Sequence, residues 1–569
     1  MKKSIIIKKS LRITFVSVAL VVGSTLLSGC NDFLDQEVLG NNTENNFYDT
    51  RYKLQSALNA VYDVLQSDAY QDTDYRFGEA LGDNVLGDEG LSSDQGQLAH
   101  FRFNTSNSVI LNRWKIEYKG IRRANQVIAN AHRVHTTTND YSAYREIREI
   151  LGQAKFLRAL FYFNLVKTFG GVPIRPEVED VDGLVIPRSS LEETYAYIEK
   201  DLREAAIMLP NRYTSANSGK ASAGAAVALL MKVLMYQGVP GTPSEKWEQL
   251  AEIGDYFVKG KSFTMARMLD YPARYGDEEW ESIRKRLWFK PQELNDESDP
   301  YEGPDFECPT LVNAYALDYK DAYGNPISYI NQFFLDGEFC QGSIFEIVFK
   351  ESGDGSTGDT NEGSSIFSNL FSANPPIHAD EMITTRLFGS DIRKSFTIGH
   401  HQYTPDMENT EILPGAILSL KWYTPIKERP VYGGDNGKNR RLLRYADVVL
   451  MYAEGLNEIG RRQESLEQLN SNKQAVNTIN NSTALYIGGG YGYIRDQIWK
   501  EREMEFAFEF DRFWDIVRQG RAKEVLKVFA DTRSNKRGAY FREGINEIFP
   551  IPQIEIDRSN GAVKQNPGY

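Results

Sequence analysis

Histidine, the side chain most often used for acid–base chemistry and metal binding near neutral pH, is scarce in this chain. The 569 residues include six, at His100, His132, His135, His378, His400 and His401. His132 and His135 could ligate a metal from one helix face, but they end a helical pattern, where a cation beside the helix C-terminus is the commoner arrangement. Adjacent residues such as His400 and His401 point their side chains in different directions. We therefore expect no metal centre and no bound cofactor.

Carboxylates are so abundant in this chain that the spacing of any two of them does not indicate a catalytic pair. With 78 Asp and Glu residues, pairs suited to glycoside hydrolysis arise by chance. The chain has no Walker loop, no Gly-x-Ser-x-Gly motif and no His-Glu-x-x-His motif. One charged run, residues 501–505 (EREME), is predicted to form Glu/Arg pairs on a solvated helix face beside a core-facing stripe. These patterns favour a protein that is not an enzyme.

The amino terminus has the pattern of an export signal. Cations between Lys2 and Arg12 precede an apolar run over residues 13–27, which is short for a membrane span and typical of a signal-peptide core. The run ends in Leu-Ser-Gly before Cys30, the first of three cysteines, as in a bacterial lipobox. We predict that residues 1–29 are a lipoprotein signal peptide and that Cys30 carries the lipid anchor. An ordinary cleavage site beside an unrelated cysteine is the alternative.

The charge of the chain limits its partners. The formal net charge is −13, and the first 29 residues contain no acid, so the remainder is more acidic still. Bulk charge therefore does not favour binding to nucleic acid or to an anionic membrane surface. In an exported protein, Cys308 and Cys340 would lie where disulfides can form. The sequence leaves open whether they form one or remain two thiols.

Two helical blocks, at about residues 45–260 and 440–530, must carry most of the core. In the first, apolar residues recur at helical spacing, and breaks such as residues 169–173 (FGGVP) and Pro210 end the helices. In the second, helices are expected at residues 442–460, about 463–480, and 493–518. Alternating helices with short breaks are typical of stacked pairs of the tetratricopeptide kind, although no strict 34-residue repeat is found.

Between about residues 260 and 440 the helical period fails, and aromatic residues mix with Pro and Gly. Residues 343–349 (SIFEIVF) are expected to form a strand, and residues 351–365 a polar loop. We therefore predict one all-α unit over residues 30–569, in which a loop-rich insert elaborates one face of the helical scaffold.

Eight short motifs follow one another along the chain. They are Cys30 with residues 32–35 (DFLD), 114–125, 154–162 (AKFLRALFY), 169–173 (FGGVP), 187–190 (PRSS), 444–454, 501–515, and 550–569 with its closing QNPGY. In this order they resemble the SusD/RagB family, the surface glycan-binding lipoproteins of Bacteroidetes polysaccharide-utilisation systems. Two places depart from the family pattern. Phe510 stands where Gly is usual, and residues 480–483 (NNST) replace an Arg-rich, Ala-Gly segment.

The resemblance implies an all-α scaffold of tetratricopeptide-like helix pairs with a loop-rich, ligand-binding face. It also implies capture of an oligosaccharide or polysaccharide at the outer membrane, on the cell exterior, and delivery to a SusC-like TonB-dependent transporter. A helical-repeat scaffold for peptide or protein, and a glycan-degrading lipoprotein enzyme, are the alternatives. The motif residues with charge are expected to form partly buried ion pairs rather than ligand contacts: Arg158, Arg444, Asp447, Glu454 and Arg512.

Family motifs assign no binding residue, so the candidate site rests on chemistry. Sugar rings stack their C–H faces on Trp and Tyr, and their hydroxyls pair with amide, carboxylate or guanidinium groups. Residues outside the helical stripes are the candidates: Trp280, Trp288, Tyr301 and Tyr323 in the insert, with Asp83 and Asn84 in an early loop. Each aromatic could instead pack a loop onto the scaffold. Trp114, Trp499 and Trp514 lie in helical stripes and are expected in the core.

Overall fold

The computed structural model describes most of the chain after residue 47. The described residues are 48–86, 90–135, 140–177, 185–213, 217–288, 307–317, 320, 327, 329–351, 435–477, 484–533 and 536–569, with short pieces between 378 and 431. The chain separates into two compact units, Met1–Tyr48 and Asp49–Tyr569. The predicted signal peptide and Cys30 belong to the first unit and lie outside the described residues.

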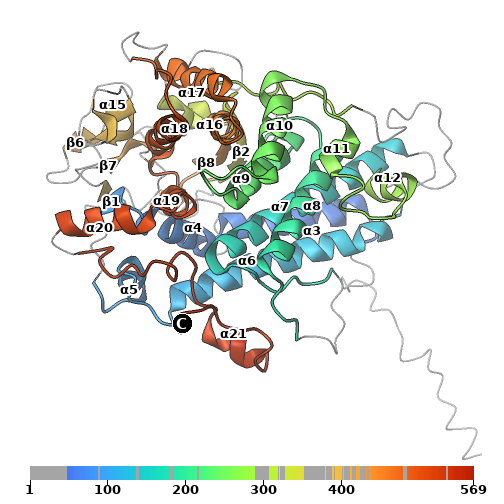
Figure 1. The fold of residues 1–569 in the computed structure, drawn as a ribbon. Coiled ribbons are helices and arrows are strands. Elements are labelled where there is room, and N and C mark those ends of the chain that lie inside the picture. Colours follow the sequence, from blue (N-terminus) through green and yellow to red (C-terminus); the bar gives the residue numbers. More distant parts are fainter. Residues whose placement is uncertain are drawn as a thin grey trace, which may run out of the picture. The chain divides into compact units, whose positions relative to one another are not determined.

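Helices dominate the described part of the second unit (Figure 1). The first block contains α3 (Arg51–Gln66), α4 (Asp68–Tyr75), α5 (Asp94–Ala99), α6 (Ser108–Asn130), α7 (Tyr141–Phe169), α8 (Leu191–Met208), α9 (Ala223–Gln237) and α10 (Glu245–Lys259). From α6 to α10 each helix packs against the next, and α3 packs against both α6 and α7. This all-α arrangement of consecutive helix pairs confirms the predicted fold class.

Local sequence signals set the helix ends in this block. Ser190 and Glu193 form a reciprocal capping box at the start of α8, satisfying two backbone N–H groups that the helix itself cannot. Gly170 ends α7 with a φ of +73°, which a side chain would disfavour. The α9 residues from Ala223 to Met235 are all buried, so this apolar helix lies inside the scaffold.

The second block contains α16 (Tyr445–Glu458), α17 (Arg462–Asn477), α18 (Tyr491–Phe506), α19 (Arg512–Arg518), α20 (Ala522–Thr532) and α21 (Gln553–Arg558). Two predicted boundaries are wrong. A helix was expected from residue 442, but residues up to Arg444 pair as a strand, and the expected helix over 493–518 is broken between α18 and α19. Because α16 packs against both α9 and α10, the two blocks belong to one unit.

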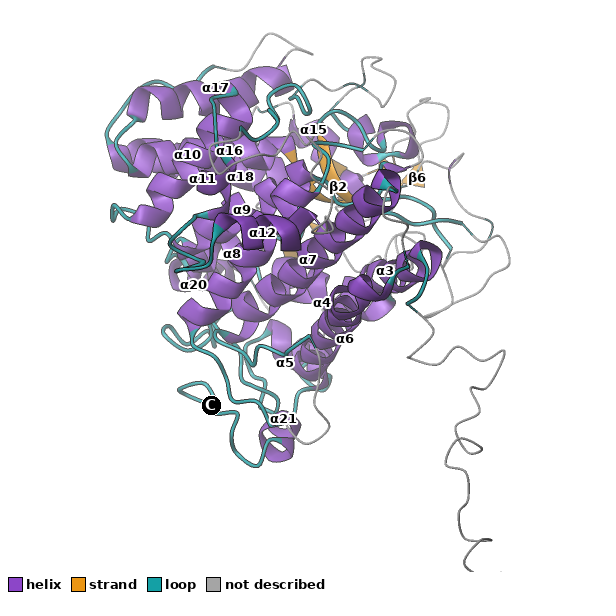
Figure 2. Ribbon diagram, turned by 90° about the vertical axis from the view of Figure 1, so that its right-hand side faces the viewer, coloured by secondary structure: helices purple, strands orange, loops and turns teal. Residues whose placement is uncertain are grey.

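The described strands are short and lie near the second block (Figure 2). The predicted strand is confirmed as β2 (Ser343–Ile347), which pairs antiparallel with β8 (Arg440–Arg444). A four-stranded sheet has the order β1 (Val85–Leu86), β3 (His378–Ala379), β7 (Leu418–Ser419) and β4 (Ile398–Gly399), and β5 (His401–Gln402) pairs with β6 (Glu411–Ile412).

The predicted insert also contains helices. They are α11 (Met265–Leu269), α12 (Trp280–Trp288) and α15 (Arg393–Thr397). Cys308 and Cys340 are free thiols, and Cys340 is buried. In the described part of the chain, no helix has the length and apolar character needed to cross a membrane.

Candidate functional site

The structure places two of the four predicted aromatic residues, and both lie on α12. Trp280 begins this helix and Trp288 ends it, so the expectation that they lie outside helical structure is wrong. The partly buried Trp280 ring packs edge to face on Tyr271, with ring centroids 5.7 Å apart. Tyr301 and Tyr323 lie outside the described residues. Trp280 and Tyr271 are therefore the aromatic pair that the structure brings together here.

A charged cleft of about 510 Å³ lies next to this pair, between α10, α11 and the residues after α16. Tyr271 joins the cleft to Trp280, and Phe263 also lines it. The charged groups in its lining are Glu245, Glu248, Glu252, Asp255, Asp270, Arg203, Arg267 and Arg461. Such groups can pair with ligand hydroxyls, and the volume lies in the range of small-molecule sites.

Part of this charge is already used within the protein. Arg267 pairs with Glu252, and Arg461 donates two hydrogen bonds to Asp255, at 2.8 and 2.9 Å. Burial opposes ionisation of Asp255, but the bonds from Arg461, Tyr452 and Lys261 outweigh it and hold the pKa of this carboxyl well below its usual range. No group of three or more His, Cys, Asp or Glu side chains suited to hold a metal ion occurs among the described residues.

Asp83 and Asn84, the predicted hydrogen-bonding residues, are both buried in the protein. Asp83 accepts hydrogen bonds from Arg512, at 2.6 and 3.2 Å, and Asn84 donates to Glu79 at 3.1 Å. Their exposed fractions are 3% and 1%. This placement favours a role in joining the first block to α19 over contact with a ligand. Local sequence could not indicate it, because Arg512 is 429 positions away.

Glu79 extends this junction to the break between α18 and α19. It lies in a π-helical turn, Arg76–Ala80, and accepts hydrogen bonds from the backbone N–H groups of Phe508, at 3.3 Å, and Phe510, at 3.1 Å. Both phenylalanines have left-handed backbone conformations. Burial raises the pKa of the Glu79 carboxyl to about 8, despite these donors.

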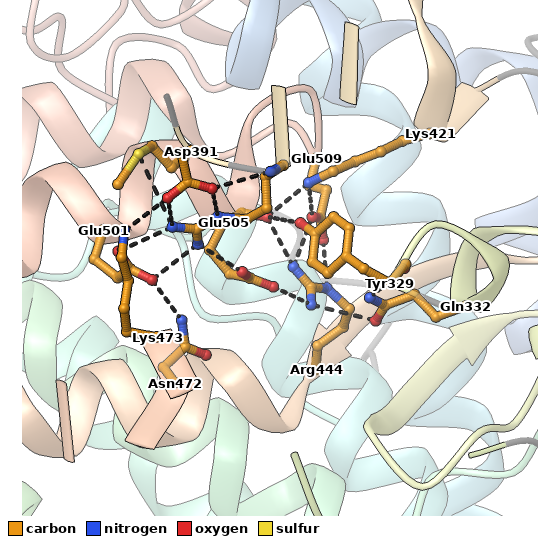
Figure 3. Close-up of polar contacts among 12 residues, drawn as sticks. Tyr329, Gln332, Asp391, Lys421, Arg444, Asn472, Lys473, Glu501, Glu505 and Glu509 are labelled. Atoms are coloured by element: carbon orange, nitrogen blue, oxygen red, sulfur yellow. Dashed lines mark hydrogen bonds and ion pairs between the residues drawn. The ribbon is translucent and has the colours of Figure 1, made fainter. Parts of the chain in front are cut away.

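The charged run at residues 501–505 is buried, so the predicted solvated face is wrong. Arg393 lies between the carboxylates of Asp391, Glu501 and Glu505, with nitrogen–oxygen distances of 2.9 to 3.0 Å. Figure 3 labels these three carboxylates. Arg444 in turn joins Glu505, at 2.8 Å, to Glu509.

Two lysines complete this buried ionic network (Figure 3). Lys473 lies 2.7 Å from Asp391, and Lys421 lies 2.7 Å from Glu509. The counter-charges of α18 therefore come from α17, from β8 and from the insert. These segments are distant from α18 in the sequence. The local pattern of alternating charge therefore gave no sign of the buried partners and suggested a solvated face.

The other charged motif residues form the ion pairs that the sequence predicted. Arg158 donates to both oxygens of Asp201, at 2.7 and 2.8 Å, while Glu454 pairs with Arg518 at 2.8 Å and Asp447 with Arg502 at 2.6 Å. The predicted core tryptophans are buried as well: Trp114, Trp499 and Trp514. These motifs therefore build the scaffold.

Comparison with known families covers both ends of the chain. Residues 32–235 match the family described as "Starch-binding associating with outer membrane", and residues 377–569 match the SusD family. SusD-like protein P38 of Formosa agariphila is 25% identical over 527 residues, which is 91% of this chain and 93% of that protein. SusD-like protein P2 of the same organism is 24% identical over 99% of this chain and 100% of its own length.

Solved structures share the fold. A laminarin-binding SusD-like protein superposes with a TM-score of 0.66 at 24% identity, covering 92% of this chain and 100% of that one. Surface glycan-binding protein A from Bacteroides thetaiotaomicron, in complex with laminarihexaose, superposes with a TM-score of 0.64 at 19% identity, covering 91% and 99%. These structures show the shared fold, and the two family matches together with the SusD-like relatives show that the chain belongs to the SusD/RagB family.

Proposed function

We propose that this protein captures an oligosaccharide or polysaccharide at the cell surface and delivers it to a SusC-like TonB-dependent transporter. The observation that carries the proposal is membership of the SusD/RagB family, supported at both ends of the chain. Relatives with the same fold are named for binding laminarin or surface glycans. Capture requires no catalytic motif, in keeping with the sequence.

The site that we propose for capture is the aromatic pair of Trp280 and Tyr271 with the charged cleft beside it. The pair supplies ring faces for stacking, and the cleft supplies carboxylate and guanidinium groups for hydroxyls. Trp288, Tyr301 and Tyr323 belong to the same stretch of chain and are proposed to extend this aromatic surface. Asp83 and Asn84 are not part of it, because both are buried, Asp83 against Arg512 and Asn84 against Glu79.

We further propose that the protein is held at the outer membrane by a lipid on Cys30, after removal of residues 1–29, with its body facing the cell exterior. Support comes from the lipobox and from the description of the matching family as associating with the outer membrane. A position beside the transporter follows, because the cargo would otherwise diffuse away before uptake.

Affinity electrophoresis tests the proposed function. The purified protein is run through native gels containing laminarin, starch, xylan or polygalacturonate, and we expect at least one of them to retard it. Chromatography of the same polysaccharide after incubation with the protein should show no shortened chains. Retardation by none of them would favour the peptide- or protein-binding alternative, and release of short products would favour the enzyme.

A further inference from the structure

A second surface, on α3, differs in chemistry from the charged cleft. Five side chains recur at helical spacing along one face of this helix, and we call them the α3 stripe: Tyr52, Gln55, Asn59, Tyr62 and Gln66. None carries a charge, although 25% of the residues in the chain are charged. At 1.5 Å per residue the stripe is about 21 Å long, enough for several consecutive sugar rings.

The stripe forms one wall of a cleft of about 470 Å³. The opposite wall comes from residues 217–220, from Phe339 and from Val348 after β2. Tyr52 lies beyond the cleft lining at the start of α3, and 81% of its surface is exposed. The cleft and the exposed ring therefore form a continuous surface that a linear ligand can follow.

Close contacts hold the two walls in place. Gln66 donates a hydrogen bond to the carbonyl oxygen of Val348 at 2.7 Å. A Cβ on Gly219 would lie only 2.5 Å from the Val348 side chain, so glycine allows this approach. The Tyr62 hydroxyl donates to Gln153 and accepts from the backbone N–H of Ala221, both at 2.9 Å. The cleft is therefore formed before any ligand arrives.

The polar groups that α3 presents to the cleft are the neutral amides of Gln55, Asn59 and Gln66 and the Tyr62 hydroxyl. Gln55 donates to the Asn59 carbonyl oxygen at 2.8 Å, which leaves the Gln55 oxygen as an acceptor and the Asn59 amide as a donor. Glu346, on the cleft floor, is buried and already accepts from the Phe339 N–H at 2.8 Å and from Asn439 at 3.0 Å. The remaining charge in the lining is Lys220, whose ammonium group lies 5.9 Å from the centre of the Tyr213 ring.

We propose that the α3 stripe and its cleft are a second glycan-binding site, selective for a neutral oligosaccharide chain. Sugar hydroxyls both donate and accept, as amides do, and Tyr52 and Phe339 offer rings for stacking. An acidic sugar would need more cationic partners than this cleft contains. The inference rests on the proposed glycan capture. Two sites on one protein would bind a long polysaccharide more tightly than a short oligosaccharide.

The test uses Tyr52→Ala and Asn59→Ala, with Tyr493→Ala and Gln474→Ala as matched exposed controls on α18 and α17. Alanine is the best helix former, so the stripe variants should fold with unchanged melting temperature. In gels containing laminarin or starch, whichever retards the wild type, each stripe variant should bind about three- to tenfold more weakly. The controls should migrate like the wild type.

Three results would overturn the inference. If the wild type is retarded but the stripe variants migrate like the controls, the second site is absent while the proposed function stands. If only polygalacturonate retards the wild type, the ligand is acidic, and the neutral site is again wrong. If no polysaccharide in the panel retards the wild type, the inference fails together with the proposed function.

Discussion

Arg393 has no exposed surface, and it donates hydrogen bonds to the carboxylates of three different residues. A buried charge of this kind is tolerated because its partners neutralise it, not because the ion pairs add much net stability. Among the described residues, removing the guanidinium would leave the buried carboxylates of Asp391 and Glu501 sharing a single cation, Lys473, while Glu505 would keep only its pair with Arg444.

We therefore expect Arg393→Met to lower the free energy of unfolding by about 3–5 kcal/mol. Urea denaturation followed by circular dichroism would measure the change. Lys527→Met is the matched control, because the Lys527–Asp531 pair is exposed and should contribute less than about 1 kcal/mol. Equal effects of the two substitutions would show that the buried network does not behave as described.

The contacts of Phe510 give a physical reason for a phenylalanine where the family usually has glycine. Its φ is +70°, a conformation that glycine adopts without strain. The ring, however, stacks on Trp422 with centroids 4.4 Å apart, and the Arg440 guanidinium lies 4.4 Å from its centre. The packing of the Phe510 ring therefore offsets the strain of its left-handed backbone conformation.

Phe510→Gly should relieve about 1–2 kcal/mol of strain and lose about 3–5 kcal/mol of packing, so we expect a net destabilisation of about 2 kcal/mol. The thermal unfolding midpoint should fall accordingly. Asn560→Gly, at an exposed residue with a φ of +49°, should change stability by less than about 1 kcal/mol. A more stable Phe510→Gly variant would mean that the ring contributes nothing to the core.

At the scale of elements, helix ends were predictable where the signal is local. The Gly-then-Pro break after Phe169 ends α7 as the sequence predicts, and Ser190 caps the start of α8. The break between α18 and α19 was not predictable, because the apolar pattern continues through it. Its geometry depends on Glu79, more than 400 positions earlier in the chain, which binds the backbone at Phe508 and Phe510.

This junction should make stability depend on pH. Burial raises the pKa of Glu79 in the folded protein to about 8, above its ordinary value of 4.5, so the folded protein holds a proton that the unfolded chain releases between these values. Stability therefore falls as pH rises through this window. Between about pH 5.5 and 7.5 Glu79 should account for a loss of about 2 kcal/mol. Glu79→Gln should remove this part and leave the part due to Glu117, whose pKa burial also raises to about 8.

Acid should destabilise the protein through the opposite effect. Burial opposes ionisation of Asp391, but its bonds with Arg393 and Lys473 hold its pKa well below the usual range, so this stabilisation is lost as the carboxyl is protonated. Urea midpoints measured from acidic to neutral pH would test both effects. Identical pH profiles for the wild type and Glu79→Gln would contradict the role assigned to Glu79.

At the scale of the whole molecule, family motifs predicted the fold and the buried ion pairs but not the binding surface. The motif residues Arg158, Arg444 and Arg512 are scaffold residues, and Asp83, chosen as a ligand contact, is the partner of Arg512. The apolar spacing in the sequence predicted the α3 helix and its buried face, but it did not indicate that the opposite face, the α3 stripe, is a binding surface. The stripe lines a cleft only because residues 217–220 and Val348 form the opposite wall, and these residues come near α3 only in the folded chain.

The proposed lipid anchor at Cys30 would fix the location of the whole protein. Cys30→Ala should move the protein from the membrane fraction to the soluble fraction of cells lacking the transporter, because the variant lacks the thiol to which the proposed lipid is attached. Immunoblotting of fractionated cells would detect it. A Ser28→Ala control, which keeps the cysteine, should remain with the membrane, and membrane retention of the Cys30→Ala protein would disprove lipid anchoring at this residue.

Isothermal titration of the purified protein with the polysaccharide that retards it is the most direct test of glycan capture. The account predicts saturable binding without shortening of the polysaccharide, and about three- to tenfold weaker binding by Trp280→Ala at an unchanged melting temperature. Tyr540→Ala, at another exposed aromatic residue, should bind like the wild type. Absence of saturable binding by the folded wild-type protein would contradict the central claim, and unchanged binding by Trp280→Ala would remove the site from the Trp280–Tyr271 pair.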